Sequence, residues 1–360
     1  MIYLDNASTA LLHPILQERL MNTLNESFAN PSSLHSIGIS ARHQVERVRE
    51  QVAELTRVKP NEVLFTSGGT EANNIVLRGL LKPGDHLITS AIEHASIHET
   101  VRHLGGVEVS ELTEITPEAT LSAIRPHTKL VSIMHVNNET GQVFELDGLY
   151  QELKRRRIYF HRDAVQSFGK LPLQGDYDFL TLSGHKLGAL KGTGGLIAKA
   201  SFLPLMSGGD QERSLRPGTE NVPGILSLGL VLEAEAGRMQ ERYDQVSQLN
   251  QSLRRLLSDS ALILSEESAS PYILSLSVPG VPSEVILNAM SAKKMYFSVG
   301  SACSARSKQH SHVIAWLSDD SLVRAGAMRL SLSWQNTLGE VEAFAKSLNE
   351  TINYLRKVLG

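Results

Sequence analysis

The chain has 360 residues, of which 41% are hydrophobic and 20% charged, and its formal net charge is −3 at pH 7. This composition is typical of a globular protein, and the charge provides no basic field that would favour nucleic acid. One cysteine cannot form an internal disulfide, which suits a reducing compartment. The sequence also lacks an apolar run long enough for a membrane span and the features of a signal peptide. We therefore expect a cytoplasmic, enzyme-sized protein without nucleic-acid or membrane partners.

In the first part of the chain, short β-rich runs alternate with helical patterns. The run EVLFTS at 62–67 precedes the helix-like EANNIVLRGLL at 71–81, whose apolar residues recur on one face. Such alternation, with nearly continuous apolar strands, predicts a mostly parallel sheet covered by helices on both faces. The further predicted strands are 86–90, 129–136, 158–163, 179–183 and 194–199, with helices expected near 94–104 and 146–157.

A second, smaller part follows a long helical stretch that reaches roughly residue 256 and is expected to break near Gly237. It contains the strand patterns YILSLSV and MRLSLSW, a helix from Ser283 and a final helix. We expect a large α/β domain at 14–244. A small α+β domain would combine 1–13 with 245–360.

The segment FTSGGTEANN is the first candidate site. A strand ends at Thr66, two glycines free the backbone, and a helix begins near Thr70. Backbone N–H groups and a hydroxyl at a helix N-terminus suit a phosphate. The segment matches neither the GxGxxG nor the Walker A pattern, and a plain strand-to-helix turn is the alternative interpretation.

Two further segments place reactive side chains after predicted strands. In SGHKLGALKGTGG, Lys186 could form a Schiff base with a carbonyl cofactor, although a solvent-facing lysine is the simpler interpretation and Lys191 competes with it. In HRDAVQS, Asp163 could pair with the pyridinium nitrogen of pyridoxal 5'-phosphate (PLP), and Gln166 could donate to the ring hydroxyl. The alternative for Asp163 is a helix N-cap.

Three more residues complete the candidate set. His94, in AIEHAS, could stack on a cofactor ring and move protons, and Asn138, in HVNNETG, follows another strand. Either could instead be an ordinary surface or turn residue. Cys303 is the only cysteine, and a small buried hydrophobe is its simplest interpretation. Its glycine–serine surroundings and the nearby Arg306 and Lys308 instead favour a reactive thiolate on a loop.

Most of these residues follow predicted parallel strands, at the edge where open α/β sheets bind ligands. Together their motifs resemble the NifS/IscS-like cysteine desulfurases, which are fold-type I PLP enzymes of the class V aminotransferase group. The resemblance covers nearly the whole chain. Its motifs are YLDNAST, NPSSLHSIG, FTSGGTEANN, EHASI, HVNNETG, DAVQS, SGHK, GGDQERSLRPGTEN, GSAC and MRLSLS.

The resemblance implies a large domain with a mostly parallel seven-stranded sheet and a smaller α+β domain that carries the nucleophile loop. It implies that Lys186 binds PLP and later moves the α-proton of the substrate, that Asp163 pairs with the pyridine nitrogen, and that His94 stacks on the ring. Cys303 would be the nucleophile that accepts sulfur as a persulfide. The ring hydroxyl would contact Gln166 and Asn138, and the phosphate would contact Gly69, Thr70, Ser183 and His185.

Two further implications concern substrate and assembly. Arg329 matches the arginine that binds the substrate carboxylate by a bidentate contact, with Asn138 beside the substrate, and Thr219 would reach the phosphate of a neighbouring subunit. The expected enzyme is therefore a homodimeric cysteine desulfurase that converts L-cysteine to L-alanine and passes sulfur to an acceptor protein. Iron–sulfur cluster assembly is one pathway that could receive the sulfur. No metal site is expected.

Other functions remain open at this stage. A selenocysteine lyase shares nearly the same chemistry, whereas an aminotransferase or β-lyase of the same fold would have no need of a loop thiol. A weakly active scaffold protein is the alternative from another class, and the intact set of Lys186, Asp163, His94 and Cys303 disfavours it. The sequence departs from the family pattern at Arg162, Val299 and Trp334, none of which is an expected catalytic group.

Overall fold

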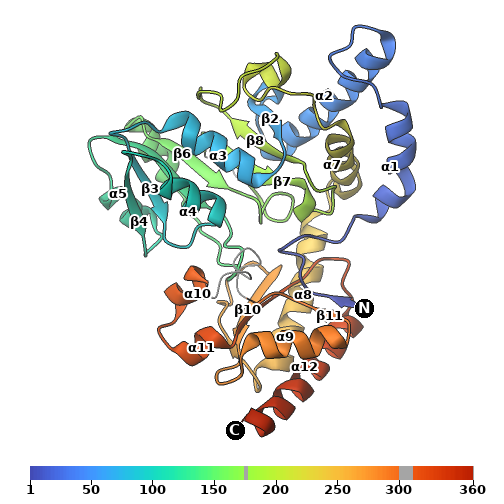
Figure 1. Ribbon diagram of the computed structural model, residues 1–360, viewed down its shortest axis with the longest axis vertical. Coiled ribbons are helices and arrows are strands. Elements are labelled where there is room, and N and C mark those ends of the chain that lie inside the picture. The colour runs from blue at the N-terminus through green and yellow to red at the C-terminus, as the bar shows by residue number, and fades with distance from the viewer. Residues whose placement is uncertain (174–176, 300–310, 360) are drawn as a thin grey trace. The chain divides into compact units, whose positions relative to one another are not determined.

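The computed structural model describes residues 1–173, 177–299 and 311–359. The chain forms two compact units, whose elements are labelled in Figure 1. Unit 1 combines Met1–Leu11, Val136–Val143 and Gln240–Gly360, whereas unit 2 combines Leu12–His135 and Phe144–Met239. The sequence predicts two domains, one at 14–244 and one that combines 1–13 with 245–360. These boundaries concern domains that fold independently, and they stay a prediction.

Unit 2 is built on one seven-stranded sheet in the order β2-β8-β7-β6-β5-β3-β4. Neighbouring strands from β4 to β7 pair in parallel, and β8 runs antiparallel to both β7 and β2. Most strand residues are buried, as expected for a sheet covered on both faces. The prediction of a mostly parallel sheet is confirmed. The strands are β2 (Val63–Thr66), β3 (His86–Ser90), β4 (Glu108–Leu112), β5 (Thr128–Met134), β6 (Tyr159–Asp163), β7 (Phe179–Ser183) and β8 (Gly194–Ala198).

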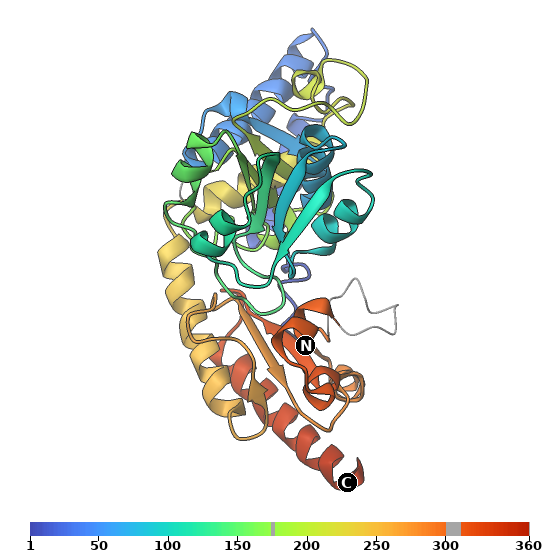
Figure 2. The same ribbon diagram turned by 90° about the vertical axis from the view of Figure 1, so that its left-hand side faces the viewer.

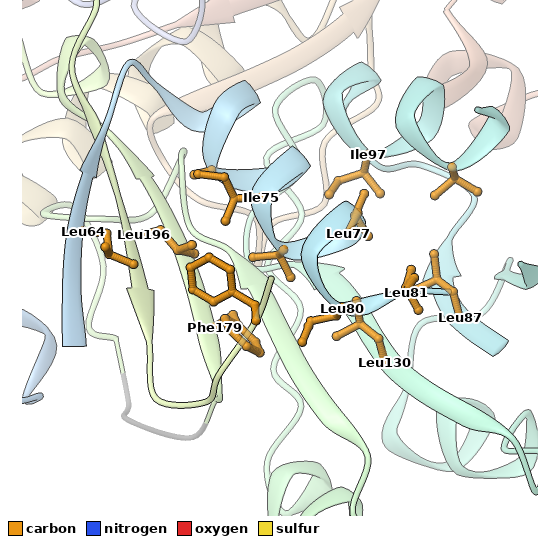
Figure 3. Close-up of a cluster of buried hydrophobic side chains, with 14 residues drawn as sticks. Leu64, Ile75, Leu77, Leu80, Leu81, Leu87, Ile97, Leu130, Phe179 and Leu196 are labelled. Carbon is orange, nitrogen blue, oxygen red and sulfur yellow. The ribbon is translucent and has the colours of Figure 1, made fainter. Parts of the chain in front are cut away.

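Helix α3 (Gly69–Leu80) packs its apolar side on β6, β7 and β8 and against α4. Figure 3 shows the resulting cluster, in which Ile75, Leu77 and Leu80 of α3 lie among side chains of the sheet such as Phe179. Full burial of each such side chain stabilises the fold by about 1.5–3 kcal/mol. The other helices of unit 2 are α1 (Pro14–Glu26), α2 (Ser36–Thr56), α4 (Ala95–Arg102), α5 (Pro117–Ser122), α6 (Leu149–Arg155) and α7 (Val222–Glu235), with 3-10 turns η1 (Pro60–Glu62), η2 (Gly184–Lys186) and η3 (Gln211–Ser214).

Unit 1 contains a three-stranded antiparallel sheet in the order β12-β10-β9 and a two-stranded parallel sheet of β1 and β11. Its long helices are α8 (Met239–Leu257, whose first residue belongs to unit 2) and α12 (Leu338–Leu359), seen in yellow and red in Figure 2. The predicted helix break is confirmed, because α7 ends at Glu235 and Gly237 takes a φ of 73°. The remaining elements are β1 (Ile2–Tyr3), β9 (Leu262–Ile263), β10 (Ile273–Ser277), α9 (Ser283–Ala292), β11 (Met295–Tyr296), α10 (His312–Leu317), α11 (Ser321–Ala325) and β12 (Ala327–Ser331).

None of the helices in the described ranges combines the length and the apolar character that crossing a membrane requires.

Candidate active site

Unit 2 places its candidate side chains where the strands of its sheet end. Asp163 is the last residue of β6, and Ser183 is the last residue of β7. Lys186 follows β7 in the turn η2, and His94 follows β3 and caps α4. Since β3, β5, β6 and β7 form a parallel series, these residues lie along one edge of the sheet. This is the edge at which ligands bind in open α/β sheets.

The carboxylate of Asp163 is buried, with 6% of the residue exposed, and two N–H groups hold it. Oδ1 accepts from the backbone N of Val165 at 2.9 Å, and Oδ2 accepts from Nδ2 of Asn73 at 2.8 Å. In the described part of the chain no cationic side chain pairs with it, so a positively charged ligand atom would offset its burial. Turns follow β6 at 165–170, which excludes the helix N-cap interpretation, and Gln166 lies buried in them.

His94 adopts extended backbone geometry and caps α4 with its ring. Its Nδ1 accepts the backbone N–H of Ser96 at 3.1 Å and lies 2.8 Å from Oγ of the same serine. Nδ2 of Asn73 donates to that Oγ at 2.8 Å. Hydrogen bonds therefore connect the ring of His94 to the carboxylate of Asp163 through two side chains.

The residue before His94 is a buried acid. Oε1 of Glu93 accepts from Oγ of Ser90 at 2.6 Å and from the backbone N of Met134 at 3.0 Å. Burial raises the pKa of Glu93 to about 8, and the negative charge of Asp163 adds to the effect. Glu93 is therefore mainly protonated at neutral pH, and it fastens the turn that carries His94 to the ends of β3 and β5.

Basic side chains gather around the turn after β7. Burial lowers the pKa of Lys170 to about 7, and the positive charge of Lys186 contributes to this shift. Burial also lowers the pKa of His185 to about 4, with further contributions from Lys186, Lys191 and Lys170. These mutual shifts show that the basic groups act on one another electrostatically. The cluster favours an anion beside it and disfavours full protonation of its own members.

The turn between β2 and α3 lies against the turn after Asp163. A Cβ at Gly69 would come within 2.6 Å of Cγ2 of Val165, so only glycine fits this close approach. Gly68 has a φ of 155°, and a Cβ at Gly194 would come within 2.5 Å of its Cα. The first N–H groups of α3 and the exposed Thr70 therefore lie beside the strand ends, where the helix dipole favours an anion.

Thr219 is exposed on a segment that begins with an unusual backbone. Glu212, Arg213 and Ser214 have φ values of 45°, 59° and 60°, all in the left-handed region. A buried ion pair holds this segment, because Nη1 and Nη2 of Arg49 each donate to the carboxylate of Glu212 at 2.8 Å. This ion pair anchors the start of the segment that leads to Thr219.

Unit 1 contains Asn138 and Arg329, which contact each other. Nη1 of the buried Arg329 donates to the backbone O of Asn138 at 2.8 Å. Nη2 donates to Oδ1 of Asp5 at 3.0 Å and to Oγ of Ser8 at 2.6 Å. The guanidinium is thus fixed in orientation by unit 1 itself. Cys303 lies outside the described residues, and its role as the nucleophile stays a prediction.

The described ranges contain no group of three or more His, Cys, Asp or Glu side chains arranged to hold a metal ion.

Comparison with known proteins identifies the family. Residues 2–344 match the model of the family described as aminotransferase class V. Two relatives named cysteine desulfurase IscS, from Methanosarcina thermophila and Dictyoglomus turgidum, are 33% and 34% identical to the chain. Each alignment covers 99% of this chain, and they cover 93% and 94% of the respective relatives. The chain belongs to the cysteine desulfurases of aminotransferase class V.

A solved structure of a NifS-like protein has the same fold as this chain. The two superpose with a TM-score of 0.91 at 31% identity, over 98% of this chain and all of the other. The predictions of family and fold class are therefore confirmed. The site roles assigned from the resemblance were not tested by these similarities and stay predictions.

Sequence reasoning missed three residues that the fold of this chain brings to the site. Asn73 and Ser96 connect Asp163 to His94, and Lys170 interacts electrostatically with Lys186. For Asn73 a clue was available, because it lies on the same helical face as the apolar Val76. A polar side chain on a buried helix face indicates a specific partner. Nothing in the sequence pattern marked Lys170.

Proposed function

We propose that this chain is a PLP-dependent cysteine desulfurase, which converts L-cysteine to L-alanine and retains the sulfur as a persulfide on Cys303. The observation that carries the proposal is the buried Asp163 carboxylate at the same sheet edge as Lys186 and His94. The full-length similarity to proteins named cysteine desulfurase supports the same substrate.

The residues of unit 2 fit PLP. Asp163 offers a buried carboxylate with no cationic side-chain partner among the described residues, which suits a protonated pyridine nitrogen. Gln166 would donate to the ring hydroxyl, and Asn138 of unit 1 would join it. When bound, PLP supplies the electron sink that weakens the bond to the sulfur of the substrate. The phosphate would bind Gly69, Thr70, Ser183 and His185, beside the basic cluster and the N-terminus of α3.

Lys186 would bind the cofactor covalently and afterwards move the α-proton of the substrate. A lysine must lose its ammonium proton for either task. The buried Lys170, whose pKa is lowered to about 7 by burial and by the charge of Lys186, lies close enough to act on this amine electrostatically. His94 would stack on the ring and accept or donate protons during the reaction. Asp163 would pair with the pyridine nitrogen, keeping it protonated and the cofactor oriented.

Arg329 would bind the substrate carboxylate. Its guanidinium is already oriented by Asp5, Ser8 and the backbone of Asn138, so little side-chain freedom would be lost on binding. The thiolate of Cys303 would then attack the sulfur of the substrate. The carbon–sulfur bond breaks, a sulfur–sulfur bond forms on Cys303, and protonation of the carbon gives L-alanine, so the two thiols yield alanine and one persulfide.

The proposal includes a homodimer, a cytoplasmic location and a protein that accepts the sulfur, as in iron–sulfur cluster assembly. Thr219 would reach the phosphate bound by the neighbouring subunit. Its exposure supports this assignment, because an exposed hydroxyl is available to a neighbouring subunit.

The test is the production of alanine and sulfide from L-cysteine, with added PLP and a thiol reductant. We expect the wild-type chain to release both products in equal amounts. The Cys303→Ala variant should retain the visible absorption of bound cofactor and lose sulfide release to below about one-thousandth. The Ser304→Ala variant, which changes the next residue in the sequence, should behave like the wild type. A wild-type chain that binds PLP and forms neither product would contradict the proposal.

A further inference from the structure

Four side chains of unit 2 form a continuous series of hydrogen bonds from one expected cofactor contact to another. Oδ2 of Asp163 accepts from Nδ2 of Asn73 at 2.8 Å, and the same nitrogen donates to Oγ of Ser96 at 2.8 Å. Oγ of Ser96 lies 2.8 Å from Nδ1 of His94. Asn73 and Ser96 are 0% and 6% exposed, so water has little access to the connection.

We propose that Asn73 and Ser96 are positioning residues that fix the tautomer and ring plane of His94 and join it to Asp163 as one unit. This inference rests on the proposed function, because it assigns the two residues a part in the same reaction. Neither residue would contact the substrate, and both would act through His94 and Asp163.

The directions of the hydrogen bonds follow from the donors available. A carboxylate only accepts, so the side-chain group of Asn73 that faces Asp163 must be the NH₂ group, which carries two N–H donors. Its second N–H points to Oγ of Ser96, which leaves the hydroxyl hydrogen of Ser96 for Nδ1 of His94. The direction of donation therefore runs from Asn73 outward to both neighbours.

The backbone supports the same assignment independently. The N–H of Ser96 also donates to Nδ1 of His94, at 3.1 Å, and a backbone N–H cannot reverse its direction. Nδ1 must therefore be the unprotonated nitrogen of a neutral ring. The proton is on Nε2, and protons exchanged by His94 during the reaction would enter and leave there.

The series has a mechanical consequence as well. Asn73 belongs to α3, Ser96 to α4 and Asp163 to the end of β6, so three elements of the core hold the ring of His94. The two expected cofactor contacts, His94 and Asp163, would therefore have a separation that is fixed before the cofactor binds. Such preorganisation lowers the ordering cost of reaching the reactive geometry.

The first test needs no substitution in the series. We would label the full chain with ¹⁵N-histidine, bind PLP and record the ring nitrogens by NMR, identifying His94 by comparison with His94→Gln. We expect Nδ1 to be unprotonated and Nε2 to carry the proton. A proton on Nδ1 would overturn the inference, because neither donor of Ser96 could then reach that nitrogen as a hydrogen bond.

The second test compares variants of the series with a matched control. Ser96→Ala removes the hydrogen bonds of Oγ to Asn73 and His94, and Asn73→Ala removes those of Nδ2 to Asp163 and Ser96. Each variant should lower kcat at least about fivefold, with little change in KM. Ser96→Thr keeps the hydroxyl and should restore the rate. Asn74→Ala removes the neighbouring asparagine of α3, which bonds to Thr70 and Thr100 instead, and should leave kcat and the NMR signals of His94 unchanged.

The double variant shows whether the residues act as one unit. We expect Asn73→Ala with Ser96→Ala to lose less than the product of the two single losses. The inference would be overturned, even with a fully active wild-type enzyme, if the loss of kcat in the double variant equalled the product of the two single losses. It would also be overturned if Asn74→Ala lowered kcat as much as Asn73→Ala or Ser96→Ala. A chain that shows the expected tautomer and releases no sulfide would instead contradict the proposed function and leave the geometry of His94 supported.

Discussion

The basic cluster after β7 in unit 2 and Arg329 in unit 1 have opposite electrostatic surroundings. In unit 2, burial and neighbouring positive charges lower the pKa of Lys170 to about 7 and that of His185 to about 4. In unit 1, Arg329 is also buried, but Asp5 supplies a countercharge, and Ser8 and the backbone of Asn138 accept further hydrogen bonds from its two terminal nitrogens. One site disfavours charge on its basic groups, and the other fixes a permanent charge.

This difference fits two kinds of chemistry. A lysine that attacks a carbonyl or moves a proton must be neutral for part of the cycle, and repulsion between like charges makes this state accessible. A residue that only binds a carboxylate should stay charged and oriented. A guanidinium suits this role because it is always charged and its N–H donors are held in one plane. The comparison predicts that activity depends on which lysine of unit 2 is replaced. In unit 1, it predicts that substrate binding depends on the planar shape of the Arg329 guanidinium.

The largest effect is expected for Lys186→Ala. Loss of the amine should remove the visible absorption of bound cofactor and lower turnover by at least about a thousandfold, because both covalent attachment and proton transfer depend on it. Absorption spectra and alanine release measure the two effects. Lys191→Ala is the control, since Lys191 is exposed on the following turn and was the competing candidate from the sequence. If Lys191→Ala lost the absorption and Lys186→Ala kept it, the assignment would be wrong.

A smaller effect is expected for Arg329→Lys, which keeps the charge and loses the planar fork. KM for L-cysteine should rise about tenfold to a hundredfold, as expected for the loss of one charged hydrogen bond, while kcat changes little. Initial-rate kinetics measure this split. Arg324→Lys is the control in the same unit, where the arginine bonds to Ser318 and Asp319. An unchanged KM in Arg329→Lys would remove Arg329 from substrate binding.

The smallest effect concerns the stability of unit 2 in acid. His161 is 0% exposed, and its ring bonds to Ser132 at 2.8 Å and to Thr181 at 3.0 Å. Burial lowers its pKa to about 3, with the charge of Arg162 adding to the shift. The folded chain therefore binds fewer protons than the unfolded chain between pH 6.5 and about 3. The free energy of unfolding should therefore decrease as the pH is lowered through this window.

The slope that His161 contributes should be about 1.4 kcal/mol per pH unit below pH 6. Urea unfolding between pH 7 and pH 5 of the wild type and His161→Gln measures it, and the variant should lose less stability on acidification. His43→Gln changes an exposed histidine and should leave the slope unchanged. Equal slopes in the wild type and His161→Gln would show that this ring does not stay neutral in the folded chain.

Local patterns were sufficient to predict six of the seven strands of the sheet of unit 2, and they missed β4, whose residues are exposed or half-buried. The buried runs of β2, β3, β5, β6, β7 and β8 are short and apolar, and the helices between them show one apolar face. The pairing order β2-β8-β7-β6-β5-β3-β4 could not be read from these patterns, because it depends on contacts between residues that are far apart in sequence. The likeness to a known family supplied the number of strands and their mostly parallel arrangement, and the pairing order was not predicted.

By itself, the sequence determined the family, the alternation of strands and helices, and the residue types at the strand ends, because chemistry requires a lysine, an aspartate and a histidine there. Only the tertiary structure decided which other side chains assist them. Asn73 is 90 residues from Asp163 and 23 from Ser96, and no local pattern reports contacts at such separations. The packing of α3 on the sheet and against α4 brings the three together, and burial then makes each hydrogen bond specific.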